Sequence, residues 1–143
     1  MTDLRLPYFK LSPEAYTELG KVKSILNKSS LGKKLIELVY LRVSQINGCA
    51  FCLEMHAKAL REDGETDNRL DSLSGWRVSK LFDERERAAL NWAESLTLIA
   101  KTGAPDSDFE QLSRYFSEVE ISDLTFAIAL MNAFNRLAIG MRQ

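Results

Sequence analysis

The stretch that decides the fold is residues 35–64, which read LIELVYLRVSQINGCAFCLEMHAKALREDG. Apolar residues recur in it at spacings of three and four, the spacing that places them on one face of a helix. The dipeptide Asn47-Gly48 interrupts this pattern, and Gly64 is a favourable residue just beyond a helix end. The stretch therefore predicts two helices joined by a tight turn, the second beginning near Cys49.

Helical spacing continues on both sides of this stretch. Helix starts are indicated by capping residues and by proline in a first turn, and helix ends by Gly or Pro breaks after the apolar periodic residues. In the first half of the chain we expect a helix from Ser12 with Pro13 in its first turn, a second from about Ser30 to Ile46, and a third from near Cys49 to just before Gly64. One or two short helical pieces should follow within 65–82 around Trp76, and then a long helix capped by Asp83 and Glu86 and stopped at Gly103-Ala104-Pro105. A shorter helix from Asp106 or Ser107 through Tyr115-Phe116 and a last one from about Ser122 to Ile139 complete the prediction.

The composition favours helix over strand. The chain has 21 Leu and 13 Ala but only 5 Val, the reverse of a strand-rich protein. No tandem repeat and no Pro/Gly/Ser-rich linker divides its 143 residues. We therefore predict an all-α, single-domain helical bundle over residues 1–143, with about six to eight helices.

Charge and hydropathy exclude several classes of partner. The net charge is -1, so no basic surplus indicates nucleic-acid binding. No uninterrupted apolar run reaches the roughly 18 residues of a membrane span, and none near the N-terminus has the length of a signal peptide. We expect a cytoplasmic protein that binds neither nucleic acid nor membrane. In a reducing compartment, two cysteines are better suited to a transient catalytic disulfide than to a structural disulfide.

The segment from Cys49 to His56 gathers the reactive residue types of the chain. It contains both cysteines and the only histidine. These side chains are suited to redox chemistry and proton transfer near neutral pH. At about 100° per helical residue, Cys52 lies about 60° from Cys49, and His56 about 40° from Cys52. All three are therefore expected on one helix face.

The spacing of the two cysteines is compatible with a reducible disulfide. Residues three apart on a helix have Cβ atoms about 5–6 Å apart, somewhat more than the roughly 3.5–4.5 Å of a disulfide. A small adjustment in a first helical turn closes that gap, and a slightly strained bond is easily reduced. The free N–H groups of a first turn also favour a thiolate.

Glu37 lies on the preceding helix, among apolar residues. A tight Asn-Gly turn would let that helix pack back against the helix of the cysteines. A carboxylate buried there would have a raised pKa and suit proton transfer.

Glu37, Cys49, Cys52 and His56 together match a Glu…Cys-x-x-Cys-x-x-x-His signature. With the flanking text from Arg42 to Cys52, this pattern resembles the alkylhydroperoxidase D and carboxymuconolactone decarboxylase superfamily. The likeness is close over residues 35–64 and looser over 91–94 and 133–136. Some members carry a second histidine directly before the second cysteine, where this chain has Phe51.

The resemblance implies a fold, an activity and partners. It implies an oligomeric helical bundle of the alkylhydroperoxidase D type, a homo-trimer or homo-hexamer. It implies an antioxidant thiol peroxidase in which Cys52 attacks a hydroperoxide, Cys49 resolves the sulfenic acid to a redox-active disulfide, and Glu37 and His56 relay protons. An external dithiol of lipoyl or thioredoxin type would reopen the disulfide, and neither metal nor other cofactor is expected. With Phe51 in place of the second histidine, the relay would be shorter and the peroxidase activity weaker.

Three alternatives remain open on the residues alone. The chain could be a dithiol-disulfide oxidoreductase without strong peroxidase activity. It could be a zinc-binding or structural oligomerisation protein, although a closed zinc site needs four ligands and only His56 and a carboxylate would join the cysteines. The superfamily name also allows lactone decarboxylation, a reaction for which cysteine chemistry is not expected.

Overall fold

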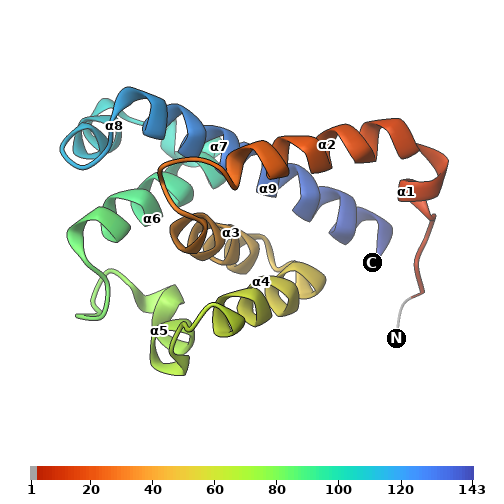
Figure 1. Cartoon of the computed structure of the whole chain (residues 1–143), viewed down its shortest axis with the longest axis horizontal. Coiled ribbons are helices and arrows are strands. Elements are labelled where there is room, and N and C mark those ends of the chain that lie inside the picture. Colours follow the sequence, from red (N-terminus) through yellow and green to blue (C-terminus); the bar gives the residue numbers. More distant parts are fainter. Residues whose placement is uncertain (1–2) are drawn as a thin grey trace.

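The computed structural model describes residues 3–143, and in that range it contains helices and no strand. The central helix is α3 (Lys33–Asn47), which packs against α4 (Ala50–Glu62), α6 (Glu84–Thr97) and α9 (Glu118–Met141). Figure 1 shows α3 in the middle of the molecule, with α2 and α9 above it and α4 and α5 below. The all-α bundle predicted from the sequence is confirmed.

The remaining helices are shorter or peripheral. They are α1 (Tyr8–Leu11), α2 (Pro13–Leu26), α5 (Asp67–Ser72), the 3-10 turn Leu73–Gly75, α7 (Ile99–Thr102) and α8 (Asp106–Ser113). Across residues 3–143 this makes nine α-helices, where six to eight were expected. The excess comes from the single turns α1 and α7, which are too short to leave a periodic pattern in the sequence.

Helix α3 begins three residues later and α8 ends two to three residues earlier than predicted, and the two largest differences are at the end of α6 and the start of α9. Helix α6 ends at Thr97, before the predicted stop at Gly103, and a break at Leu98 separates it from α7. Helix α9 begins at Glu118, four residues before the predicted Ser122. Ser117 and Glu120 form a capping box at that start, the same device that was recognised at Asp83 and Glu86.

The turn between α3 and α4 positions the two cysteines. Gly48 has a φ of +71°, a left-handed conformation that L side chains adopt only at a cost. The N–H groups of Gly48 and Cys49 both donate to the carbonyl of Ser44, at 2.9 and 3.1 Å. This closes α3 and sets Cys49 at the N-cap of α4, as the Asn-Gly signal predicted.

Helix α9 is long and apolar enough to cross a membrane by length and composition, with 39% of its most apolar window buried. That is weak evidence, because a core helix has the same composition. In this protein α9 packs against α2, α3, α4 and α6. We interpret it as a core helix with one uncovered face.

Both ends of the described chain lie on the side of the molecule where α4 begins (Figure 1). The backbone N–H of Arg5 donates to the carbonyl of Met141 at 2.7 Å, and the Arg5 guanidinium donates to the carbonyl of Gly140. The hydroxyl of Tyr8 donates to Oε1 of Gln143. The segment before α2 is thereby fastened to the end of α9.

Candidate active site

The two cysteines lie together in the first turn of α4, and both are free thiols. Cys49 occupies the N-cap and Cys52 follows one turn later. Only 1% of Cys49 and 2% of Cys52 is exposed, and both pack against Ala138 of α9. The structure therefore brings the two sulfurs to one place at the opening of one helix.

The Cys52 thiol is neutral at physiological pH. Burial, and then the neighbouring Cys49 thiol, raise the pKa of Cys52 to about 12. A hydrogen bond from the Asn135 amide and one from the helical backbone act in the opposite direction. The first turn of the helix favours a thiolate, as expected from the sequence, but desolvation of Cys52 outweighs its N–H groups.

Glu37 and His56 form a buried pair between α3 and α4, with His56 one helical turn after Cys52. Nδ1 of His56 lies 2.7 Å from Oε2 of Glu37, with 1% of the histidine and 6% of the glutamate exposed. The antiparallel packing of α3 and α4 brings these side chains together from positions 19 residues apart. A carboxylate at Nδ1 fixes the orientation of the ring and leaves Nε2 as the free nitrogen.

That free nitrogen is buried without a hydrogen-bond partner in the described part of the chain, and so is the hydroxyl of Tyr40. The ring of Tyr40 lies against the imidazole, with centroids 5.3 Å apart. Burial, then the charge of Glu37, raise the pKa of Tyr40 above its usual range, so its hydroxyl stays protonated. Buried polar atoms are rarely left unpaired, and their gathering at one place is typical of a functional site.

Asn135 links α9 to this site, a role that sequence reasoning missed. Its side chain is fully buried and donates to Oγ of Ser44 at 3.1 Å, while its Oδ1 accepts from Asn47 at 3.0 Å. Asn132 also bonds within the chain, to Asn47 and Arg136. The signal that could have located both asparagines was a pair of amides in a largely apolar helix.

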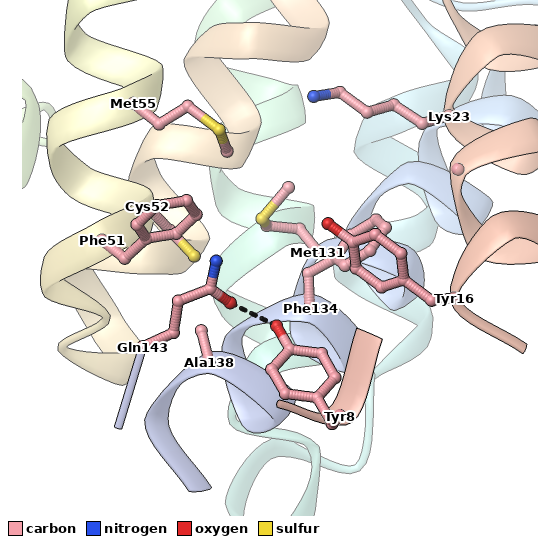
Figure 2. A pocket seen from close by; sticks show the side chains of 11 residues that line it. Tyr8, Tyr16, Lys23, Phe51, Cys52, Met55, Met131, Phe134, Ala138 and Gln143 are labelled. Atoms are coloured by element: carbon pink, nitrogen blue, oxygen red, sulfur yellow. Dashed lines mark hydrogen bonds between the residues drawn. The ribbon is translucent and has the colours of Figure 1, made fainter. Parts of the chain in front are cut away.

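A pocket of about 210 Å³ opens beside Cys52. Figure 2 shows the Cys52 sulfur directed into it, between Phe51 and the side chain of Gln143. Its walls come from α1, α2, α4 and α9 and are mostly apolar or aromatic: Tyr8, Tyr16, Gly20, Lys23, Phe51, Met55, Met131, Phe134, Ala138 and Gln143. A compact pocket with a reactive side chain in its wall is the usual form of a small-molecule site.

Cys49 borders a different and more open hollow. Gly48, Ala50, Ala138, Ile139, Arg142 and Gln143 form the rest of its lining. The two sulfurs therefore neighbour different openings, although their helix positions are only three residues apart.

The donor set around the cysteines does not resemble a metal centre. Within residues 3–143, no group of three or more His, Cys, Asp or Glu side chains is arranged to hold a metal ion. His56 is turned toward Glu37 through Nδ1. The zinc-binding alternative gains no support from this geometry.

Comparison with known proteins assigns the chain to a family. Residues 12–95 match the model of the carboxymuconolactone decarboxylase family, and this range contains all four signature residues. The chain belongs to the carboxymuconolactone decarboxylase family. The uncharacterised protein YdfG of Bacillus subtilis is 34% identical over 137 residues, which cover 96% of this chain and 93% of YdfG.

Solved structures place the chain among the family's AhpD-like proteins. A protein of unknown function from Agrobacterium tumefaciens, described as a candidate AhpD antioxidant defence protein, is 43% identical with a TM-score of 0.95, over 99% of this chain and 97% of that one. A peroxidase-related protein from Silicibacter sp. TM1040 is 26% identical with a TM-score of 0.82, over 92% and 70% of the two chains. The resemblance drawn from the signature is thus confirmed. Enzymes occur in this family, so an enzymatic, antioxidant role is the starting point for the function.

Proposed function

We propose that this protein is a thiol peroxidase that reduces organic hydroperoxides with the Cys49–Cys52 pair. The observation that carries the proposal is the position of Cys52: its sulfur lies in the wall of a pocket, with a second thiol beside it. A peroxidatic cysteine needs an opening for the oxidant and a nearby thiol that prevents overoxidation.

The first reaction consumes one hydroperoxide. The Cys52 sulfur attacks the outer oxygen of ROOH, an S–O bond forms and the O–O bond breaks. The products are a sulfenic acid on Cys52 and an alkoxide, which takes up the proton originally on Cys52 and leaves as ROH. The thiolate is the attacking species, and the departing alkoxide needs an acid.

His56 can serve both needs. Because the resting thiol of Cys52 is neutral, attack requires a base, and Nε2 of His56 is a free nitrogen one helical turn away. Glu37 at Nδ1 holds the ring in place and stabilises the imidazolium that forms. The same nitrogen then returns the proton to the alkoxide, directly or through a water molecule.

The second reaction closes the disulfide. The Cys49 sulfur attacks the Cys52 sulfenic acid, an S–S bond forms and water leaves. An external dithiol of lipoyl or thioredoxin type then reduces the disulfide and becomes a disulfide itself. The more open hollow beside Cys49 supports attack of that reductant on the Cys49 sulfur. The antioxidant role, the cytoplasmic location and the homo-oligomeric state belong to this proposal.

The proposal is tested by counting thiols. Reduced protein mixed with excess cumene hydroperoxide should lose both thiols within minutes, and its intact mass should fall by about two hydrogens. The Cys52→Ser variant should keep its Cys49 thiol. The Cys49→Ser variant should stop at a sulfenic acid that dimedone traps. Persistence of both thiols in the wild-type protein would refute the peroxidase.

Two other substrates, a disulfide and a lactone, separate the peroxidase from the alternative functions. Rapid oxidation by a disulfide such as lipoamide, with both thiols persisting in peroxide, would identify a dithiol-disulfide oxidoreductase. Turnover of a carboxymuconolactone that is unaffected by Cys52→Ser would identify a decarboxylase instead.

A further inference from the structure

The pocket beside Cys52 contains one charged side chain. Lys23 reaches it from α2, and Figure 2 shows its amino group extended toward the side of the pocket where Met55 lies. The remainder of the wall is apolar or aromatic, apart from the hydroxyls of Tyr8 and Tyr16 and the amide of Gln143. A single cation in such surroundings is a strong point of attraction, because low polarity strengthens electrostatic interactions.

No carboxylate of the described residues pairs with Lys23. Its neighbours one turn away are Leu19, Gly20 and Leu26 of α2 and the C-cap residue Asn27, none of them acidic. Lys21, two residues earlier, is instead paired with Glu18 at 2.8 Å on the exposed side of the helix. Lys23 is half-buried, and within residues 3–143 no carboxylate balances its charge.

Two further residues of α2 share this face. Tyr16, Gly20 and Lys23 follow one another at spacings of four and three residues, which aligns them along one side of a helix. The hydroxyl of Tyr16 points into the pocket (Figure 2). Gly20 lies between the two polar groups and has no side chain, and a Cβ built on it meets nothing within 4 Å. The face therefore offers two donors with open space between them.

We propose that this pocket binds a small organic hydroperoxide carrying a carboxylate, with that carboxylate on Lys23 and Tyr16 and the peroxide group at Cys52. The apolar body of the substrate would lie against Phe51, Met131 and Phe134. One ammonium and one hydroxyl suit a monoanion, whereas phosphate groups are usually bound by several donors, such as arginines or a helix N-terminus. The proposal rests on the peroxidase function and narrows its substrate class.

A matched pair of substrates tests the proposal. Cumene hydroperoxide and its 4-carboxy derivative have the same reacting group and differ in one carboxylate. For the wild-type protein, kcat/KM should be about tenfold higher for the carboxylated compound, as expected for one charge-assisted hydrogen bond. In Lys23→Met the ratio of the two values should fall to about one, and in Lys23→Arg most of it should remain. Lys21→Met is the control, because it removes an exposed lysine from the same helix. This variant should keep the full wild-type ratio of the two kcat/KM values.

A binding measurement separates this proposal from the peroxidase function. The alcohol product of the carboxylated substrate, 4-(2-hydroxypropan-2-yl)benzoate, is titrated into reduced protein and followed by chemical shifts of the Met55 and Met131 methyl groups. Saturable binding that Lys23→Met weakens about tenfold supports the carboxylate site even if no peroxide is consumed. Equal kcat/KM values for the two peroxides, or unchanged binding in Lys23→Met, would overturn it.

Discussion

At the scale of single residues, Cys52 has a position that favours a thiolate and surroundings that oppose one. The first turn of α4 offers N–H groups, but the sulfur is almost fully buried beside a second thiol. The second effect prevails, and the pKa of Cys52 rises to about 12. In the proposed mechanism, reactivity at neutral pH therefore depends on transfer of the Cys52 proton to a neighbouring base.

The raised pKa of Cys52 predicts the pH dependence of alkylation. In the unfolded chain a cysteine titrates near pH 8.5, roughly, whereas in the folded protein the proton is retained to higher pH. The rate of iodoacetamide alkylation of Cys52 in the reduced wild-type protein, separated from that of Cys49 by peptide mass, should still rise between about pH 9 and 10, where an unfolded control has levelled off.

The same shift affects stability. Because the folded pKa is higher than the unfolded one, Cys52 contributes stability that is present below about pH 8.5 and is lost as the pH rises toward the folded value. Removing Asn135, whose amide lowers the pKa, should move the alkylation profile to still higher pH. A rate plateau of the folded protein near pH 7 would contradict the shift.

Glu37 predicts a separate effect on catalysis. Glu37→Gln keeps an acceptor for Nδ1 of His56 but removes the negative charge that stabilises the imidazolium. Peroxide consumption, followed by stopped-flow fluorescence, should slow by about 100-fold, the lower end of the range for loss of acid–base assistance. Glu65→Gln is the control, because Glu65 is also a buried carboxylate but lies beyond the opposite end of α4. Equal rates in the two variants would remove Glu37 from the relay.

At the scale of elements, the α3–α4 hairpin does most to build the site. It places Glu37 and His56 in contact and holds Cys49 at a helix start through the left-handed Gly48. The sequence was sufficient to locate this hairpin, since an Asn-Gly break between two periodic segments is a local signal. The Glu37–His56 contact could not be derived in the same way, because it depends on how the two helices rotate against each other.

Gly48 gives a prediction for the hairpin. An alanine at φ +71° is strained, so Gly48→Ala should lower the free energy of unfolding by about 1–2 kcal/mol. Gly48→Asn should lose less, since asparagine tolerates the left-handed region. Urea denaturation measures both variants. An alanine variant as stable as the wild-type protein would show that the turn relaxes without strain.

Other features of the fold show which structures local sequence patterns predict and which they do not. The capping box of Asp83 and Glu86 was found from the sequence, while the equivalent box of Ser117 and Glu120 was overlooked and the start of α9 misplaced. The pocket was beyond prediction, because its lining comes from α1, α2, α4 and α9. The sequence indicates for Tyr16 only a place on the helix that has Pro13 in its first turn, and the three-dimensional arrangement is needed to show its hydroxyl at a pocket.

At the scale of the whole molecule, one face of α9 lacks a partner within the described structure. Val119 is 68% and Phe126 61% exposed, and Phe109 of α8 adds to the same surface. Exposed apolar patches of this kind mark contacts with other chains. We expect further copies of this chain to cover it, in line with the trimer or hexamer implied by the resemblance.

Sedimentation equilibrium tests this expectation. The wild-type protein should have a mass that is a multiple of the 16.2 kDa chain, and Phe126→Glu should shift it to smaller species, because a charge would be buried at the contact. Val78→Glu is the matched control, since Val78 is 90% exposed and lies outside α9. A wild-type protein that sediments as a monomer would end the expectation of an oligomer.

The fastening of Arg5 and Tyr8 to the last residues of α9 has a practical consequence for laboratory work. Gln143 borders the hollows beside both sulfurs, so an affinity tag fused directly after this residue would begin beside the two thiols. A histidine-rich tag there would also bring metal ions and extra imidazoles to the thiols. Purification handles are therefore best removed by protease before redox behaviour is measured.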